Sequence, residues 1–168
     1  GDLRSKSALH IVTELDTSTG ALIAKNPYNT EFPNRVAFFD VDDPQYDFTA
    51  DRTEFIGRNG TLEDPDAMRR TRLSGKSGSG LDPGTAIRVP FDLDNGAERE
   101  VIFRLGAGRD RYEAEETIKR FQGSKMASHA LEKVRTFWDH TLGSIQIETP
   151  DASLNILSNG WLLYQVIS

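Results

Sequence analysis

The sequence predicts a mainly β fold, built as an antiparallel β-sandwich and followed by helices. Apolar residues alternate with polar ones in several short stretches before residue 106, which is typical of half-buried strands. Turn-forming residues such as Asn95-Gly96 separate these stretches. The composition changes at Gly106-Ala-Gly108, and apolar residues then recur at three- and four-residue steps, as they do in amphipathic helices.

Three strands are expected in the first quarter of the chain. Residues 9–15 alternate as one strand, residues 16–20 supply a turn, and residues 21–24 return as the second arm of a hairpin. Residues 34–41 form the third strand, whose apolar side chains fall on both faces, as expected between two layers.

A further hairpin is predicted near the end of the β region. Residues 87–93 and 101–105 both alternate, and Asp94-Asn95-Gly96 lies between them. Because Asn-Gly tolerates the positive φ angles of a tight turn, these arms are expected to pair with one another.

Three helices are expected after residue 108. The first covers residues 110–122, and the second runs from residue 125 to 142 with Ser124 as its N-cap. The third starts with Thr149 as cap and Pro150 at its first position, and it is apolar nearly all round. Such a helix requires burial on most of its sides.

The composition excludes several classes of function. The formal net charge of -6 argues against a nucleic-acid surface, which needs a basic stripe. No apolar run is long enough to span a bilayer, so no direct membrane contact is expected. The chain lacks cysteine, and its three histidines lack metal-ligand spacing, so neither a disulfide, nor a metal site, nor a cofactor is expected.

The candidate binding residues lie in the stretch 51–61, which reads as a loop between strands, with the glycine-rich run 73–83 following it. The stretch offers donors and acceptors together, as hydroxylated ligands require. The four candidates are Arg52, Glu54, Arg58 and Asn59. Two interpretations stay open: surface salt bridges that hold the loop, or arginines that point into a sugar or phosphate site.

Short phrases along much of the chain carry a family resemblance. They are His10-Ile-Val-Thr-Glu-Leu-Asp16, Thr19-Gly20-Ala21, Asn26-Pro27, Arg35-Val-Ala-Phe38, Asp51-Arg52, Glu54-Phe-Ile-Gly-Arg-Asn-Gly60, Gly80-Leu-Asp-Pro83, Thr149-Pro-Asp151, Asn159 and Trp161-Leu-Leu-Tyr-Gln165. Together these phrases resemble the carbohydrate-binding β-sandwich of glycoside hydrolase family 94, which contains cellobiose, chitobiose and cellodextrin phosphorylases. The resemblance covers nearly the whole chain from Ala8, and it is strongest to the branch of the family found in bacterial cyclic β-1,2-glucan synthases.

The resemblance implies a division into three parts. Residues 1–107 would belong to a partial supersandwich, residues 108–148 to a helical linker, and residues 149–168 to the first helix of a truncated (α/α)6 barrel. The family's catalytic aspartate and phosphate-binding residues lie on that barrel, after the last residue of this sequence. No catalytic residue is therefore assigned here, and inorganic phosphate is expected only as a co-substrate of the complete enzyme.

Two functions follow as hypotheses. In the first, the chain is a non-catalytic sandwich and linker portion of a phosphorylase-like module, supporting glucan binding and chain-length control. Its partners would be β-glucan, the remainder of the parent polypeptide and a second copy bound through residues 150–168. It would lie on the cytoplasmic side of a bacterial inner-membrane protein. In the second, it is a stand-alone carbohydrate-binding or assembly module. The apolar last helix favours the first hypothesis, because a free module should end polar.

Overall fold

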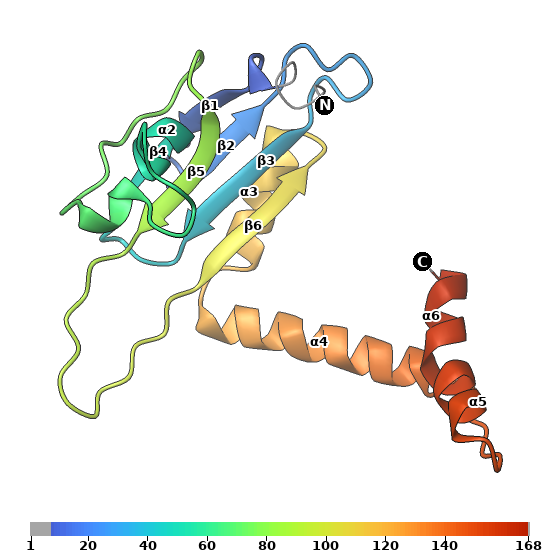
Figure 1. Ribbon diagram of the computed structural model, residues 1–168. Coiled ribbons are helices and arrows are strands. Elements are labelled where there is room, and N and C mark those ends of the chain that lie inside the picture. The colour runs from blue at the N-terminus through green and yellow to red at the C-terminus, as the bar shows by residue number, and fades with distance from the viewer. Residues whose placement is uncertain (1–7, 168) are drawn as a thin grey trace. The chain divides into compact units, whose positions relative to one another are not determined.

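The computed structural model describes residues 8–167, which divide into two compact units, the first ending at Ser124 and the second beginning at Lys125. The first unit carries the strands of the described residues, arranged as two antiparallel sheets (Figure 1). Within residues 8–167, no helix has the length and apolar character needed to cross a membrane.

The larger sheet has the strand order β1-β2-β3-β6. Its strands are β1 (Val12–Leu15), β2 (Leu22–Lys25), β3 (Val36–Val41) and β6 (Phe103–Gly108), and every neighbouring pair is antiparallel. The predicted first hairpin and the predicted third strand are therefore confirmed. The turn between β1 and β2 uses Gly20 at φ 76°, a conformation that glycine adopts without steric cost.

Helix α3 (Arg111–Arg120) packs against one face of this sheet, as Figure 1 shows. The helix was expected over residues 110–122, and its N-cap is Asp110, whose side chain accepts from the Glu113 N–H. At Gly106 an added Cβ would lie 2.5 Å from the Phe38 ring, so a side chain there would displace this buried ring from the core. The core between sheet and helix consists of Ala21, Ile23, Val36, Phe38, Ala114 and Ile118.

The smaller sheet pairs β4 (Asp47–Asp51) with β5 (Pro83–Arg88). Residues 75–78 of the glycine-rich run lie along the other edge of β4, where the Ala50 N–H donates to the Lys76 carbonyl at 2.8 Å. The same segment reaches β1, because the Thr13 N–H donates to the Gly78 carbonyl at 3.0 Å. The glycine-rich run therefore joins the two sheets through its backbone.

The predicted hairpin between residues 87–93 and 101–105 is wrong. The first arm ends early, as part of β5, and pairs with β4, whereas the second arm begins β6 and pairs with β3. The turn itself exists, with Gly96 at φ 80° and the Ala97 N–H donating to the Asp94 carbonyl at 3.0 Å. An Asn-Gly turn specifies only a local reversal of the chain. Here the two arms pair with strands of two different sheets instead of with each other.

The second unit is helical. It contains α4 (Ser124–Leu142), α5 (Ala152–Ile156), a π-helical turn (Leu157–Trp161) and α6 (Leu162–Ile167). None of the residues of these elements is buried, and the Trp138 ring of α4 lies 5.7 Å from the Tyr164 ring of α6, measured between centroids.

The predicted cap of the last helical segment is wrong by two residues. Asp151, not Thr149, is the N-cap, because its carboxylate accepts from the Ser153 N–H at 2.9 Å. The Thr149 hydroxyl is instead 2.7 Å from the Asn155 side-chain oxygen. An ionised carboxylate is the stronger acceptor for the exposed N–H groups of a helix start, so it takes the cap position.

Candidate functional site

The stretch predicted as a loop begins with a short helix, α2 (Arg52–Ile56), so the loop interpretation is wrong over these five residues. Asp51 caps the helix by accepting from the Thr53 N–H at 3.0 Å, and Lys76 lies 3.1 Å from the same carboxylate. The pattern Asp51-x-x-Glu54 resembles a capping box, a sequence signal that could have located this helix.

Glu54 is a buried anchor of the site. Its side chain is 4% exposed, and it accepts from the Thr49 hydroxyl at 2.7 Å, the Ser74 N–H at 2.9 Å and the Ser74 hydroxyl at 2.5 Å. Arg70 lies 3.6 Å away. Burial by itself would raise the pKa of Glu54, but these hydrogen bonds and the Arg70 charge outweigh it and lower the pKa. Glu54 thus fixes α2 to β4 and to the glycine-rich run, and it points inward.

A turn at the end of α2 presents the next two candidates to solvent. Arg58 and Asn59 are exposed, and within residues 8–167 neither side chain has a hydrogen-bonding or ionic partner. The turn depends on Gly57, whose φ is 87° and where a Cβ would lie 2.0 Å from the Asp66 carboxylate. At Gly60 a Cβ would lie 1.8 Å from the Ile56 carbonyl oxygen. Arg58 and Asn59 therefore project into solvent from a turn whose flanking positions, 57 and 60, have room only for glycine.

Arg52 lies where α2 meets the glycine-rich run. Its guanidinium is 3.3 Å from the Asp82 carboxylate, and its backbone N–H donates to the Asp82 carbonyl at 2.8 Å. Both side chains are about two-fifths exposed, at 40% and 44%. An ion pair so exposed contributes roughly 0–1 kcal/mol, so Arg52 remains available to a ligand.

The structure therefore separates the four candidates by role. Arg52 pairs at the surface, Glu54 turns inward as an anchor, and Arg58 and Asn59 share one exposed turn. The sequence analysis did not identify Asp82 as the partner of Arg52, because thirty residues separate the two in the chain.

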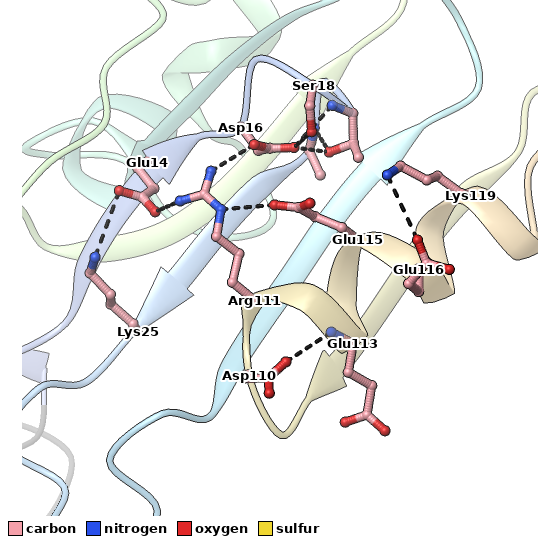
Figure 2. A network of polar contacts seen from close by, with 12 residues as sticks. Glu14, Asp16, Ser18, Lys25, Asp110, Arg111, Glu113, Glu115, Glu116 and Lys119 are labelled. Carbon is pink, nitrogen blue, oxygen red and sulfur yellow. Dashed lines mark hydrogen bonds and ion pairs between the residues drawn. The ribbon is translucent and has the colours of Figure 1, made fainter.

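A second polar network fastens α3 to the larger sheet (Figure 2). The Arg111 guanidinium lies 2.6 Å from Glu14, 2.6 Å from Asp16 and 2.9 Å from Glu115. Burial alone would raise the pKa of Asp16, but hydrogen bonds from the turn that follows and from Arg111 lower it far below its ordinary range. Every acceptor in this network serves the packing of α3 and the turn after β1, so we assign it a structural role.

A buried ion pair lies between β3 and β6. Asp40 and Arg104 occupy opposite positions in the strand register, their side chains are 1% and 10% exposed, and Arg104 also pairs with Asp42. Burial raises the pKa of Asp40 although the guanidinium beside it acts in the opposite direction. This ion pair could not be predicted from the sequence, because Asp40 and Arg104 are far apart in the chain.

No group of three or more His, Cys, Asp and Glu side chains among residues 8–167 is arranged to hold a metal ion. The described surface around α2 offers guanidinium, amide and carboxylate groups for direct hydrogen bonding to a ligand. Groups of this kind bind hydroxyls and oxyanions.

Comparison with known proteins shows what the chain is similar to. It is 33% identical over 168 residues to a cyclic beta-(1,2)-glucan synthase of Rhizobium meliloti, covering 99% of this chain and 6% of that protein. It is 24% identical over 143 residues to a cellobionic acid phosphorylase of Neurospora crassa, covering 85% of this chain and 18% of the relative. An N,N'-diacetylchitobiose phosphorylase of Vibrio proteolyticus is 26% identical over 142 residues, covering 82% of this chain and 17% of the relative.

The chain thus spans less than a fifth of the length of these relatives. The domain family described as glycosyl hydrolase 94, supersandwich domain, matches residues 2–124, which end where the first compact unit ends. The two antiparallel sheets of that unit agree with a supersandwich domain. The chain belongs to glycosyl hydrolase family 94, through its supersandwich domain.

Proposed function

We propose that this chain is the non-catalytic sandwich and linker portion of a β-glucan phosphorylase-like module in a cyclic β-1,2-glucan synthase, where it supports glucan binding and chain-length control. The observation that carries the proposal is the turn at the end of α2. Arg58 and Asn59 are exposed there without partners in the described chain, while Glu54 and Asp51 fix the helix that precedes them. Such a fixed base reduces the entropy that a ligand contact costs.

The ligand proposed for this site is β-glucan. Sugar hydroxyls need donors and acceptors at fixed positions, which Arg52, Arg58 and the Asn59 amide supply. Inorganic phosphate is the co-substrate proposed for the complete enzyme, since a guanidinium fork also binds phosphate. The glucan synthase relative gives the expected linkage, β-1,2.

The second unit supports a role within a longer polypeptide. Its helices bury none of their residues, and large apolar side chains stand in water, among them Phe137, Trp161 and Leu162 at 55%, 57% and 48% exposure. We infer that residues 108–148 act as a linker and that residues 149–168 begin an (α/α)6 barrel, whose remaining helices would cover these side chains. We further propose that the module lies on the cytoplasmic side of a bacterial inner-membrane protein.

The proposal is tested in the intact synthase with Arg52→Ala and Arg58→Ala. Losing a charge-assisted hydrogen bond to the ligand costs roughly 1.5–3 kcal/mol, which corresponds to a loss of about ten- to hundredfold in glucan affinity. The exposed Arg72, replaced by alanine, is the matched control, and melting temperatures should stay unchanged in all three variants. Unchanged turnover and KM together with a lower melting temperature would show that the two arginines only hold the segment.

A second test separates binding from catalysis. The purified 168-residue chain should release no glucose 1-phosphate from β-1,2-glucan in the presence of phosphate, because the residues proposed here bind sugar and supply no acid catalyst. Release of glucose 1-phosphate at a rate that survives repeated purification would refute the non-catalytic role.

A further inference from the structure

The loop between β2 and β3 borders a hollow that is separate from the α2 turn. This loop extends beyond one end of the larger sheet, as Figure 1 shows. The hollow has a volume of about 250 Å³. Its floor is apolar and comes from the sheet and the residue before β1: Ile11, Ala24, Val36, Ala37 and Ala107.

The rim of the hollow consists of hydrogen-bond donors. Asn26 and Asn29 use their side-chain oxygens to accept backbone N–H groups of the loop, at 3.0–3.1 Å. Their amide NH2 groups have no partner within residues 8–167 and remain free to donate. Lys25 adds an ammonium group whose nearest carboxylate, on Glu14, is 3.7 Å away.

Arg35 supplies the strongest donor of the rim. Its guanidinium carbon lies 4.2 Å from the centre of the Phe32 ring, and its backbone N–H donates to the Phe32 carbonyl at 3.2 Å. Within residues 8–167 no carboxylate pairs with Arg35, in a chain whose net charge is -6. A second hollow, of about 270 Å³, is also lined by Phe32 and Arg35, and Arg109 borders it. The loop therefore holds a stacked guanidinium that lines two hollows and has no carboxylate partner in the described part of the chain.

We propose that this hollow binds one hydroxylated ring that carries an oxyanion, that is, a sugar phosphate or a sugar acid. The oxyanion would be held by the planar fork of Arg35, which matches the geometry of carboxylate and phosphate groups. The two asparagine amides would donate to ring hydroxyls, and the apolar floor would contact the C–H face of the ring. That the ring is a sugar rests on the proposed function, whereas the requirement for an oxyanion rests on the rim alone.

The size of the hollow suits a single ring. Ligand pockets span roughly 300–1,000 Å³, and this one falls just below that range. None of the residues that line the hollow belongs to α2 or to the turn after it, so the site is distinct from the glucan site proposed there. The hydrogen bonds that fix Asn26 and Asn29 to the loop backbone also make the site pre-formed, which lowers the entropic cost of binding.

The test is a set of NMR or calorimetric titrations of the 168-residue chain with glucose 6-phosphate, glucuronate, glucose and inorganic phosphate. We expect binding of one or both anionic sugars, at least about tenfold tighter than binding of glucose or of phosphate alone. The arm that binds more tightly identifies the oxyanion. Equal binding of glucose would overturn the requirement for an oxyanion, and equal binding of inorganic phosphate would overturn the requirement for a ring.

Variants locate the site and separate it from the α2 turn. Arg35→Gln should lower the affinity for the anionic sugar about tenfold or more, and Arg35→Lys should lower it less. Arg58→Gln should leave this affinity unchanged. The affinity for a neutral β-1,2-linked gluco-oligosaccharide should respond in the opposite way. Arg58→Gln should lower this affinity, and Arg35→Gln should leave it unchanged. The proposed site would be overturned if Arg35→Gln and Arg58→Gln changed the affinity for the anionic sugar equally, or if Arg35→Gln did not change it. The titration with the gluco-oligosaccharide tests the proposed function independently.

Discussion

Replacing Glu54 with leucine tests whether the inward carboxylate holds the candidate site together. Glu54 accepts three hydrogen bonds, two from Ser74 and one from Thr49, and Thr49 is completely buried. Leucine is of similar size but accepts none of them. The substitution therefore leaves the buried Thr49 hydroxyl without an acceptor and releases Ser74, which is exposed enough to bond to water.

The expected cost follows from this difference in burial. An unsatisfied buried polar group costs roughly 1–3 kcal/mol, and the lost charge-assisted bonds to the half-solvated Ser74 add less, so we expect about 2–3 kcal/mol in total. For a domain of this size, that loss lowers the melting temperature by roughly 4–12 °C. Glu54→Gln keeps one acceptor oxygen, and its amide can donate to a hydroxyl that has rotated, so its cost should stay below about 1 kcal/mol.

Urea denaturation of the 168-residue chain measures both variants, with Glu63→Gln as the control because Glu63 is exposed in the same segment. The folded pKa of Glu54 lies below its ordinary value of 4.5, so its stabilisation is present above that value and is lost as the pH falls through the folded pKa. The difference between wild type and Glu54→Leu should therefore shrink in acid. A loss for Glu54→Leu no larger than that for Glu63→Gln would refute the anchoring role.

Three further predictions follow from the buried and strained groups. Arg104→Met should cost roughly 3–5 kcal/mol by leaving Asp40 buried without its partner, and adding Asp40→Leu should restore much of that loss in urea denaturation. Gly57→Ala should lower the melting temperature, because its φ of 87° and ψ of 157° cost any other residue roughly 1–3 kcal/mol and the Cβ would meet Asp66. Since hydrogen bonds lower the pKa of Asp16, its contribution is present above the unfolded value of about 4 and lost below it, so Asp16→Asn should flatten the acid limb of the stability profile.

The sequence predicted elements whose signals are local. The hairpin of β1 and β2, the strand β3 and the helix α3 were all expected within a few residues of their observed bounds. In each case alternation, a glycine turn or a capping aspartate acts over fewer than about ten residues. The structure agrees because nothing distant competes with these signals.

Pairing between distant segments could not be predicted from the residues. Alternation specifies which face of a strand is buried but not which edge accepts it, so the arms around Asn95-Gly96 were paired with each other, whereas β5 and β6 entered different sheets. The same limit applies to the glycine-rich run. Its backbone bonds to β4 and β1 arise from tertiary packing and leave no pattern in residues 75–78.

The candidate site shows the same division. Composition drew attention to the stretch 51–61, and Arg52, Arg58 and Asn59 do lie at the surface there. The inward direction of Glu54 could not be predicted, because it depends on Ser74, twenty residues further along the chain. The position of Glu54 beside two arginines suggested a ligand contact. In the structure its carboxylate instead fixes the segment that carries these arginines.

Residues 150–168 provide the last prediction, which concerns association. Val166 and Trp161 are 84% and 57% exposed, and nearby leucine and isoleucine side chains are exposed as well. Full burial of one such side chain contributes roughly 1.5–3 kcal/mol, and contiguous apolar surface normally drives association. We therefore expect the 168-residue chain to self-associate in sedimentation, and the same chain ending at residue 149 to stay monomeric at equal concentration. A monomeric full chain that keeps its helical circular dichroism at the highest concentration would show that these faces tolerate water, and the proposed barrel contact would then lose its physical basis.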